Sequence, residues 1–403
     1  MKLKNIFTLL FLATFLFSCF FSSSPIAAKT IHVGEKGYEF ESIQAAVENA
    51  DSGDTIFVHC GVYYGSINLY KKINLIGEKG CTILSTNEND DIISISADGC
   101  NVSGFVVLNC SNSDFSGFNI ESDNNIIENN IIKDNVGWGL YIYHSSGNII
   151  RNNTFENDSI SIIGQKSDWT SSTIENNTVN GLPILFYKNK QKIVISNHIA
   201  GQIILANCSF CEIINNTVSG SDQGIVLGHS NNNTVEKNHV SNTLMGIRLP
   251  YTDYSIVKQN NVSNNDYGLY ITHSINNQIL GNCIFSNRMY GCYLCCNAKY
   301  NVFSRNNFTQ NNNSAYDYFE NEWSLEGIGN YWSDYSGTDE NNDGIGDTPY
   351  DIPPDFGTKK DNYPIVNYDL IKKEDNGISG FSIAALIFSF IFILIIKGRR
   401  LFS

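Results

Sequence analysis

An asparagine that returns about once every 22 residues limits the folds that this chain can adopt. Successive members of the series lie 19 to 24 residues apart, each among aliphatic or β-branched neighbours. The series consists of Asn130, Asn153, Asn177, Asn197, Asn216, Asn238, Asn260, Asn282 and Asn306. Between them, apolar residues alternate at period two over three to five positions and then give way to Asn, Ser and Gly. This pattern is typical of short strands separated by tight turns.

A unit of this length holds three short strands and three turns, and it cannot bury its apolar side alone. Units stacked in parallel, about 4.8 Å apart, pair every strand with the coils above and below and bury a continuous apolar column. Each asparagine then lies over its equivalents, where side-chain amides can hydrogen-bond along the stack. The sequence therefore predicts an all-β fold, a right-handed parallel β-helix forming one rod, in preference to an antiparallel sandwich.

A short amphipathic segment precedes the repeats. Residues 40–50 place apolar side chains at Ile43, Ala46, Val47 and Ala50, which is a helical period, and Ser42 is a suitable N-cap. The first coil of a solenoid would otherwise expose core and unpaired strand edge. We therefore predict an N-terminal capping helix.

The first residues resemble an export signal. Lys2 and Lys4 precede an apolar run over residues 6–21, and small or polar residues continue to Ala28. This three-part layout predicts a secretory signal peptide cleaved near Ala28. A lipoprotein cleavage box ending at Cys19 and an uncleaved anchor helix are the alternatives.

The last residues predict a membrane anchor. Residues 380–396 are almost wholly apolar, and Lys397, Arg399 and Arg400 follow at once. Seventeen residues are at the short limit for crossing a hydrocarbon core of about 30 Å, and the cations mark the cytoplasmic side. We expect one transmembrane helix and an exported rod that stays anchored to the cell membrane, with a buried terminal helix as the alternative.

These features divide the chain into seven segments. We assign residues 1–28 to the signal peptide, 29–54 to the N-terminal cap, 55–315 to the β-helix repeats, 316–368 to a C-terminal cap, 369–379 to a linker, 380–396 to the transmembrane helix and 397–403 to a cytoplasmic tail.

Net charge restricts the partners of the rod. A formal charge of -14 with a pI near 4.9 argues against nucleic acid, because phosphate contacts need clustered Lys and Arg. Basic ligands, neutral ligands and divalent cations fit this charge better. Acidic polysaccharides would be repelled on average, although local patches can override the mean.

Several motifs carry a family resemblance. The predicted cap is followed by DSGDTIFV at residues 51–58, GVY at 61–63 and INLIG at 73–77, and the chain later carries GNYWSDY at 329–335, DGIGDTPY at 343–350 and DNYP at 361–364. In this order the motifs resemble the pectin-lyase-like β-helix superfamily and, within it, the NosD type. The resemblance covers roughly residues 30–368, and the closing block is its most specific part.

The resemblance implies a secreted β-helix, and the NosD type includes copper-handling accessory proteins for nitrous oxide reductase as well as carbohydrate-binding surface proteins. Periplasmic copper carriers commonly use Met and His, whereas this chain has only Met245 and Met289 beyond the initiator. A shared fold alone therefore does not secure the copper role. The C-terminal segment is similar to the sorting tails of archaeal surface proteins, with Ser379-Gly380-Phe381 where those tails carry Pro-Gly-Phe.

One loop has the spacing of a calcium site. Asp339, Asn341, Asp343 and Asp347 place oxygen-bearing side chains around glycines, matching the first part of the pattern D-x-N-x-D-G. Position twelve is Tyr350 where a bidentate Glu would be expected. We predict a weak structural calcium site, with an ion-free turn as the alternative.

Outward positions beside the repeat glycine form two columns of aromatic and other large side chains. The first column is Trp138, Gln223, Met245, Tyr267 and Tyr290, and the second is Tyr141, Val226, Arg248, Tyr270 and Tyr293. Aromatic faces one coil apart can stack on the apolar faces of sugar rings. The six aromatic residues are therefore candidate carbohydrate ligands, and simple cover of a strand face is the alternative.

Histidines and cysteines offer weaker metal candidates. His144, His229 and His273 each precede Ser and fall nine residues before a repeat asparagine, which predicts one column of turn-lining residues. The CxxC pairs of Cys208 with Cys211 and of Cys292 with Cys295 suit zinc or Cu(I), but a second ligand pair at fixed spacing is missing, so core packing or a disulfide is favoured.

Catalysis has less support than binding. Hydrolases of this fold need paired carboxylates about 5 to 9.5 Å apart. Asp90 and Asp91 are sequence neighbours that face opposite sides of a strand, and Asp222 and Asp253 have no partner near the same column. We therefore favour an anchored surface module that binds a polysaccharide or glycoprotein, ahead of a copper-binding accessory protein and a polysaccharide lyase or hydrolase.

Overall fold

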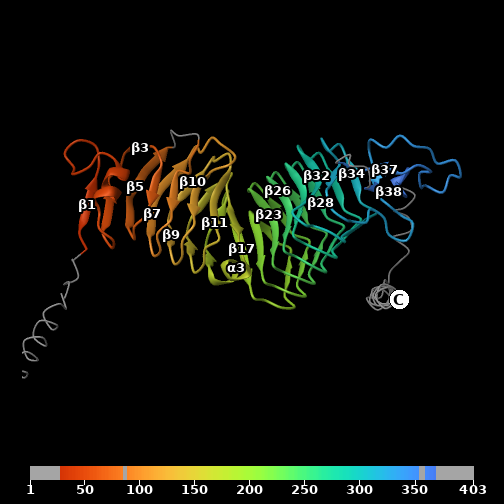
Figure 1. The fold of residues 1–403 in the computed structure, drawn as a ribbon, viewed down its shortest axis with the longest axis horizontal. Helices are drawn as coiled ribbons and strands as arrows, with labels where there is room; N and C mark the ends of the chain where they lie inside the picture. Colours follow the sequence, from red (N-terminus) through yellow and green to blue (C-terminus); the bar gives the residue numbers. More distant parts are fainter. Residues whose placement is uncertain (1–27, 85–88, 354–358, 369–403) are drawn as a thin grey trace, which may run out of the picture.

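The computed structural model describes residues 28–84, 89–353 and 359–368, and over these residues the chain is almost wholly β. Strands of successive coils pair in parallel, so the predicted all-β parallel β-helix is confirmed. The prediction of one continuous rod is wrong, because the coils form two stacks that meet at an angle near α3 (Lys166–Ser171) and β17 (Leu182–Lys188), as Figure 1 shows.

The first stack has three columns of parallel strands. Column one holds β1 (Thr30–Val33), β2 (Thr55–Val58), the first parts of β5 (Asn74–Leu84) and β7 (Asn101–Leu108), β9 (Ile126–Glu128), β12 (Ile149–Arg151) and β15 (Thr173–Glu175). Column two holds β3 (Val62–Tyr64), the second parts of β5 and β7, β10 (Ile131–Lys133), β13 (Thr154–Glu156) and β16 (Thr178–Val179). Column three holds β4 (Ile67–Leu69), β6 (Ile93–Ile95), β8 (Ser116–Ile120), β11 (Trp138–Tyr143) and β14 (Ile160–Ile163).

The second stack repeats this plan. Its column one holds β17, β20 (Gln202–Ala206), β23 (Gln223–Gly228), β26 (Met245–Pro250), β29 (Tyr267–Thr272), β32 (Tyr290–Cys295) and β35 (Ala315–Asp317). Column two holds β18 (Val194–Ser196), β21 (Glu212–Ile214), β24 (Thr234–Glu236), β27 (Ile256–Lys258), β30 (Gln278–Leu280) and β33 (Val302–Ser304). Column three holds β19 (Ile199–Ala200), β22 (Thr217–Ser219), β25 (His239–Ser241), β28 (Asn261–Ser263), β31 (Cys283–Phe285), β34 (Asn307–Thr309) and β36 (Tyr331–Trp332).

A hairpin ends the first stack. Strands β16 and β17 pair antiparallel, with Val179 opposite Leu182, and Asn180 and Gly181 between them have φ of 49° and 79°. Two left-handed residues in a two-residue loop are the geometry that Asn-Gly favours in hairpins. The reversal prevents the next coil from continuing the first stack.

Caps close the described ends of both stacks. Helix α2 (Ile43–Asn49) buries Ile43, Ala46 and Val47, and the Ser42 hydroxyl accepts from the Ala45 N–H, so the predicted capping helix is confirmed. At the other end Trp332 is buried below Phe308, and a small antiparallel pair, β37 (Tyr350–Asp351) and β38 (Lys360–Asp361), follows.

The predicted signal peptide and transmembrane helix lie outside the described residues, apart from Ala28. Among the helices of residues 28–368 that the structure describes, none is long and apolar enough to cross a membrane.

Buried asparagine side chains join the turns of successive coils, as predicted. The Oδ1 of Asn260 accepts from the backbone N–H of Asn238 at 2.9 Å and from the Asn238 amide at 3.0 Å. Its Nδ2 donates to the carbonyl oxygen of Val235 and to Oδ1 of Asn282, both at 2.9 Å. The amide thereby pairs backbone groups that the turn would otherwise leave unsatisfied in the core.

The coil holds such ladders at more than one corner, whereas the sequence predicted one. The second stack has ladders of Asn216, Asn238, Asn260, Asn282, Asn306 and Asn330, of Asn277, Asn301 and Asn321, and of Asn265, Asn287 and Asn311. The first stack has ladders of Asn125 and Asn148, and of Asn130, Asn153 and Asn177.

One predicted ladder member is wrong. Asn197 is exposed at φ of 61°, and the backbone N–H of His198 bonds to Asn216 Oδ1 in the position of a ladder residue. Each turn has a left-handed residue just before the ladder asparagine, as in Asn152 before Asn153. Because Asn suits both positions, spacing alone could not separate them.

The long ladder ends on a carboxylate. Asp361 Oδ2 accepts from the backbone N–H of Asn330 at 2.6 Å and from the Trp332 indole at 2.9 Å. A Cβ on Gly329 would lie 1.8 Å from this carboxylate, so the position requires glycine. These contacts explain why GNYW and DNYP occur together in the closing block. Burial raises the pKa of Asp361 to about 6.

Replacing Asn260 by Ala tests the ladder. The change removes the partners of the Asn238 N–H and the Val235 carbonyl, at roughly 1–3 kcal/mol for each buried group. We expect Asn260→Ala to lower the free energy of unfolding by about 2–6 kcal/mol in urea titrations. The matched control is Asn312→Ala, at an exposed asparagine, which should change it by less than about 0.5 kcal/mol. Equal stability of the two variants would contradict a structural role for the ladder.

Candidate functional site

The junction of the two stacks, which we call the elbow, brings a strand edge against a sheet face. Within the described chain β14 pairs only with β11, so its other edge has no strand partner. Side chains from the second stack replace that strand. Gln202 Nε2 donates to the Ile160 carbonyl at 2.8 Å, and a ring nitrogen of His229 lies 3.0 Å from the Gly164 carbonyl. The elbow therefore satisfies a strand edge that would otherwise be unpaired.

Apolar contacts hold the same junction. Ile204, Ala206 and Val226 point outward from the second stack and are buried against the core of the first. Trp169 of α3 packs so closely on Gly228 that a Cβ there would lie 2.3 Å from the indole ring. The two stacks thus share a packed interface.

Two charged side chains are buried at the elbow. Asp222 Oδ2 accepts from the backbone N–H groups of Ser159 at 2.7 Å and Gly139 at 3.2 Å. Arg248 is 4% exposed, and its Nη1 donates to Gln223 Oε1 at 3.0 Å and to the Ile162 carbonyl at 3.4 Å. Its Nε has no hydrogen-bond partner among the described residues. Burial lowers the pKa of Arg248 to about 10, so the guanidinium stays charged at neutral pH.

Asp222 has a carboxyl neighbour in Asp158 of the first stack, which the sequence did not reveal. Burial raises the pKa of both groups, and the charge of Asp222 raises that of Asp158 further. The amide of Asn135 donates to Asp158 Oδ2 at 2.7 Å. Two carboxyl groups in one dry site cannot both ionise cheaply, so we expect Asp158 to hold a proton near neutral pH.

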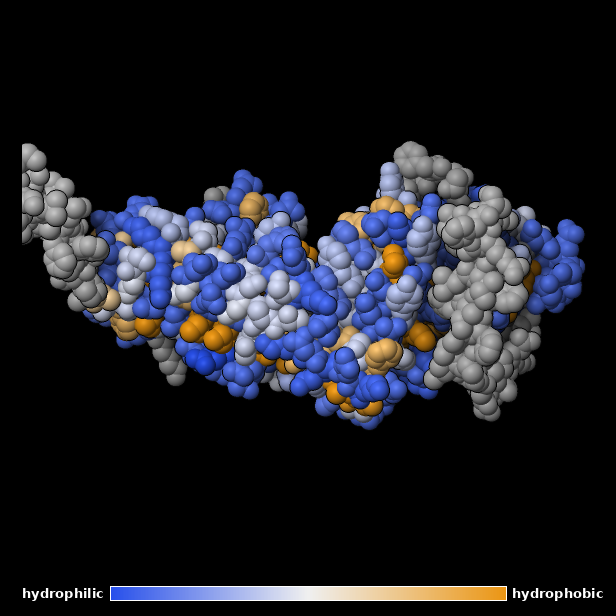
Figure 2. Space-filling model, turned by 60° about the horizontal axis from the view of Figure 1, so that its bottom comes forward, coloured by the Kyte–Doolittle hydropathy of each residue, from blue (hydrophilic) through white to orange (hydrophobic). Residues whose placement is uncertain are grey.

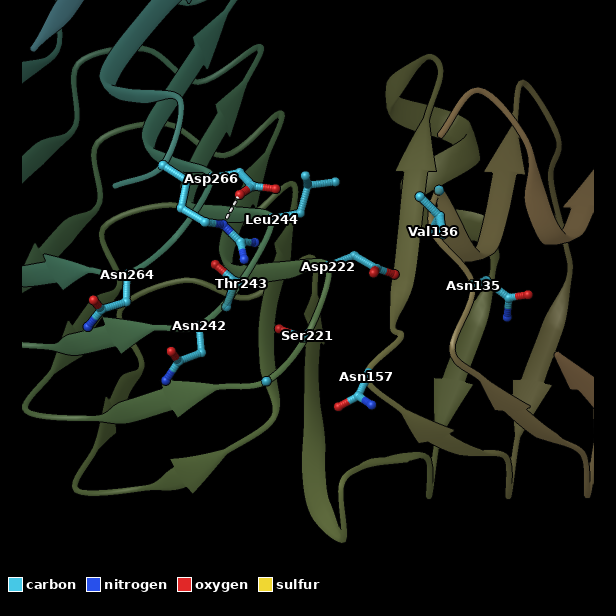
Figure 3. Close-up of a pocket in the computed structure, with 13 residues that line it drawn as sticks. Asn135, Val136, Asn157, Ser221, Asp222, Asn242, Thr243, Leu244, Asn264 and Asp266 are labelled. Carbon is cyan, nitrogen blue, oxygen red and sulfur yellow. Dashed lines mark hydrogen bonds and ion pairs between the residues drawn. The ribbon is translucent and has the colours of Figure 1, made fainter. Parts of the chain in front are cut away.

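A polar pocket of about 320 Å³ opens between the stacks beside these carboxyl groups (Figure 3). Asn135 and Asn157 come from the first stack, and Asp222, Asn242, Asn264 and Asp266 come from the second. Arg288 forms an ion pair with Asp266 at its rim. Carboxylate, amide and guanidinium groups in one pocket can bind a ligand that carries many hydroxyl groups.

The pocket lies next to predicted aromatic positions on both stacks. Gly137, which lines it, directly precedes Trp138, and Asp266 directly precedes Tyr267. The face in Figure 2 is mostly hydrophilic, with hydrophobic residues only in small separate groups.

The structure divides the six aromatic candidates between two sheets. The second stack confirms the predicted register of both columns. Met245 pairs with Tyr267 and Tyr267 with Tyr290, while Arg248 pairs with Tyr270 and Tyr270 with Tyr293. Trp138 and Tyr141 belong instead to β11 of the first stack, where Tyr141 pairs with Ser161. Gln223, Val226, Met245 and Arg248 are buried, so the predicted outward columns are interrupted at the elbow.

Rings in each column cover one another. Tyr267 and Tyr290 stack with centroids 6.0 Å apart, as do Tyr270 and Tyr293 at 5.4 Å. Burial raises the pKa of Tyr293 to about 12 and holds that of Tyr267 above its ordinary value. Within the described part of the second stack, the rings of Tyr267 and Tyr270 are the last before the elbow. On the elbow side the buried Met245 and Arg248 follow them in the same columns.

The predicted calcium loop uses its own oxygens as hydrogen-bond acceptors. Asp339 accepts from the N–H groups of Asp343 at 3.1 Å and Gly344 at 2.9 Å, and Asp347 accepts from the Glu340 N–H at 2.7 Å. Asn341 Oδ1 accepts from the Asp343 N–H at 3.0 Å. Calcium binding by Asp339, Asn341, Asp343 and Asp347 stays a prediction without support from this geometry.

The cysteine candidates fit core packing better than a metal site. Cys208, Cys211 and Cys292 are buried. Cys295 and Cys296 have sulfur atoms 3.0 Å apart, but burial raises the pKa of Cys295 to about 12. Since the thiolate is the metal-binding form, Cys295 is a poor ligand at neutral pH.

The predicted histidine column is correct only in part. Tyr251 stacks between His229 and His273, with centroids 4.6 Å from each. His144 lies in the first stack, where its backbone N–H donates to the Ile163 carbonyl at 2.9 Å, so its predicted place in that column was wrong.

A different histidine pair was missed at the N-terminal end. His32 Nδ1 and His59 Nε2 are 3.0 Å apart although the residues are 27 positions apart in the sequence. No spacing signal marked them, because His32 precedes the counted repeats. Over residues 28–84, 89–353 and 359–368, no group of three or more His, Cys, Asp or Glu side chains is arranged to hold one metal ion.

Comparison with protein families agrees with the closing-block motifs. The model of the periplasmic copper-binding protein (NosD) family matches residues 47–202 and 172–337. The chain belongs to the NosD family. The NosD-type parallel β-helix predicted from the motifs is thus confirmed, and the family is described as periplasmic.

Two curated relatives share a short segment with this NosD-family chain. The probable ABC transporter binding proteins NosD of Pseudomonas aeruginosa and Stutzerimonas stutzeri are 40% and 41% identical to it over 86 residues. The segment is 21% of this chain and 20% and 19% of the relatives, so the chain matches about a fifth of their length.

Solved structures of other β-helices are more distant. The chain is similar to the A-module of mannuronan C-5 epimerase AlgE6 of Azotobacter vinelandii, with 14% identity, a TM-score of 0.33 and coverage of 72% of this chain and 94% of that chain. Pectate lyase Pel9A is 13% identical, with a TM-score of 0.32 and coverage of 75% of this chain and 74% of that chain. Similarity at this level carries no conclusion about substrate or reaction.

The carboxyl pair at the elbow predicts how stability varies with pH. Because the pKa of Asp158 is higher in the folded than in the unfolded state, the folded state keeps a proton that the unfolded state releases. The stabilisation that this bound proton gives to the folded state is fully present below the unfolded pKa of about 3.8. It is lost as the pH rises through the folded pKa, at up to about 1.4 kcal/mol per pH unit. Asp158→Asn, which cannot ionise, should match the natural protein at pH 4 and exceed its melting temperature at pH 8.

The matched control is Asp134→Asn, at an exposed neighbouring carboxylate with φ of 55°, a conformation that Asn tolerates. Thermal unfolding of both variants between pH 4 and pH 9 checks the prediction. The prediction is wrong if the melting temperatures of Asp158→Asn and of the natural protein change with pH to the same extent.

Proposed function

We propose that this NosD-family protein is an extracytoplasmic module that binds a neutral polysaccharide at the elbow. The observation that supports this most directly is the polar pocket between the two stacks, whose lining residues Gly137 and Asp266 are the chain neighbours of Trp138 and Tyr267. Sugar recognition combines hydrogen bonds to hydroxyl groups with contact between apolar ring faces and aromatic side chains. The pocket supplies the polar groups, and the two aromatic residues next to its lining in the chain are the candidates for the ring contact.

The charge of the protein favours a neutral ligand. The net charge is -14, and the charged side chains lining the pocket are Asp222, Asp266 and Arg288. Arg288 is already paired with Asp266, so the pocket offers no unpaired cation at its rim for a sugar carboxylate.

The pocket gives less support to hydrolysis. Glycosidases need one carboxyl group that donates a proton and a second that acts as nucleophile or base. Asp222 is 5% exposed and accepts hydrogen bonds from two backbone N–H groups, while Asp266 forms an ion pair with Arg288. These contacts suit carboxylates that shape a pocket.

Binding can be tested with glycan arrays followed by calorimetry on the full chain. We expect Trp138→Ala and Tyr267→Ala each to weaken binding of the selected glycan about tenfold, the factor that corresponds to losing about 1.4 kcal/mol of aromatic contact. Tyr318→Ala is the control, because this tyrosine is 59% exposed and directly follows β35, the strand of column one most distant from the elbow. Unchanged binding in both elbow variants would refute the site, and shortened glycans after incubation would favour an enzyme.

The family description favours copper binding as a second function. The buried cysteines Cys208 and Cys292 fit this role poorly, since burial raises the pKa of their thiols. The pair of His32 and His59 fits it better, because neutral imidazole is a common copper ligand and the two ring nitrogens lie 3.0 Å apart.

A further inference from the structure

The first two coils bring two imidazole nitrogens to one position. His32 lies in β1, and His59 directly follows β2, which pairs with β1 in parallel. His32 Nδ1 lies 3.0 Å from His59 Nε2, and the rings are 5.3 Å apart at an angle of 24°. His32 is exposed and the His59 side chain is 23% exposed, so solvent and solutes can reach the pair.

The third coil supplies a carboxylate behind this pair. Glu78 Oε2 is 3.3 Å from Nδ1 of His59 and accepts from the backbone N–H of Cys60 at 3.2 Å. A carboxylate on one ring nitrogen fixes the tautomer of a histidine and leaves the other nitrogen as a lone-pair donor. Glu78 at this distance favours a proton on Nδ1 of His59, the tautomer in which Nε2 keeps its lone pair on the side of His32.

The distance between the two nitrogens suits a shared ion. Nitrogens bound to one ion at 2.0–2.1 Å lie about 2.8 Å apart at neighbouring corners of a square and about 3.4 Å apart at corners of a tetrahedron. The observed 3.0 Å falls inside this interval. The distance between the two nitrogens is therefore compatible with one shared ion.

The surroundings add rigidity and negative charge. Tyr38 stacks on His59 with centroids 4.1 Å apart, and Phe57 contacts the same ring edge-on at 5.1 Å. A pocket of about 700 Å³ lies beside His59, and its charged lining comprises Glu35, Glu41, Glu78 and Lys36. Three carboxylates against one ammonium group favour a cation, and the open space leaves room for water or an exchangeable ligand.

We propose that His32 and His59 bind one divalent transition-metal ion, copper(II) or zinc(II), with Glu78 as the positioning residue that orients His59. The site is separate from the elbow and deepens the copper-binding alternative to the proposed carbohydrate function. A plain hydrogen bond between the two imidazoles is the competing explanation of the 3.0 Å contact, and the two make different predictions for metal binding.

The full chain, purified without a polyhistidine tag, should be titrated by calorimetry with copper(II) alone and with zinc(II) alone. We expect one ion per chain, and electron paramagnetic resonance of the copper form should show coupling to two imidazole nitrogens. His32→Ala and His59→Ala should each lower the affinity more than tenfold. Glu78→Gln should lower it about tenfold while both nitrogens remain bound, the effect typical of a carboxylate behind a ligating histidine.

His239→Ala is the matched control, because His239 is an exposed histidine on β25 of the second stack and should leave affinity and spectrum unchanged. Unaltered copper binding after loss of both His32 and His59 would overturn this site while leaving copper binding as a function. If the natural chain binds neither ion, both the site and the copper alternative fall. Glycan binding measured on the same variants should not change, so the carbohydrate proposal stands or falls separately.

Discussion

The structure depends on how a tightly coiled backbone satisfies its polar groups at the corners of each coil. Strands pair with their neighbours, but a corner buried inside a stack leaves N–H and C=O groups without strand partners. The side-chain oxygen of an asparagine at the corner accepts hydrogen bonds from N–H groups of the preceding coil. Its NH₂ group donates to a backbone carbonyl of the preceding coil and to the side-chain oxygen of the asparagine in the next coil. Asn238, Asn260 and Asn282 show this as an unbroken chain of bonds from 2.8 to 3.0 Å. Because each of these bonds joins equivalent residues of neighbouring coils, the ladder makes the coils stack in register.

The same requirement explains the elbow. The ladder of the first stack ends at Asn177 and that of the second starts at Asn216, because the Asn180-Gly181 turn reverses the chain and His198 occupies the corner between them. The interruption leaves one edge of β14 without a strand. Outward side chains of the second stack satisfy that edge, which is why Gln202, Asp222 and Arg248 are buried there. The polar pocket is therefore a consequence of an interrupted repeat.

Much of the fold follows from the sequence, and the failures have local causes. The repeat predicted parallel coils, a buried ladder and the register of Tyr267 with Tyr290, because period and alternation fix those features. It did not predict two stacks, since the count of residues continued through the Asn180-Gly181 turn, although that dipeptide is itself a hairpin signal. Trp138 and Tyr141 were misplaced for the same reason, because register cannot be extended across a reversal. The approach of His32 to His59 depends on the pairing of the first two coils, which no repeated residue marks.

The interruption of the repeat at the elbow also affects the aromatic columns. Along an unbroken stack, each outward ring is one coil from the next, and Tyr270, Tyr293 and Tyr316 cover one another at 5.4 and 4.9 Å. At the elbow the run of tyrosines stops, and the buried Arg248 and Met245 occupy the next positions beside Tyr270 and Tyr267. The polar groups left by the broken repeat line the elbow pocket through residues such as Asp222 and Asp266, and Asp266 directly precedes Tyr267 in the chain. A solenoid of perfect period would not expose these groups together.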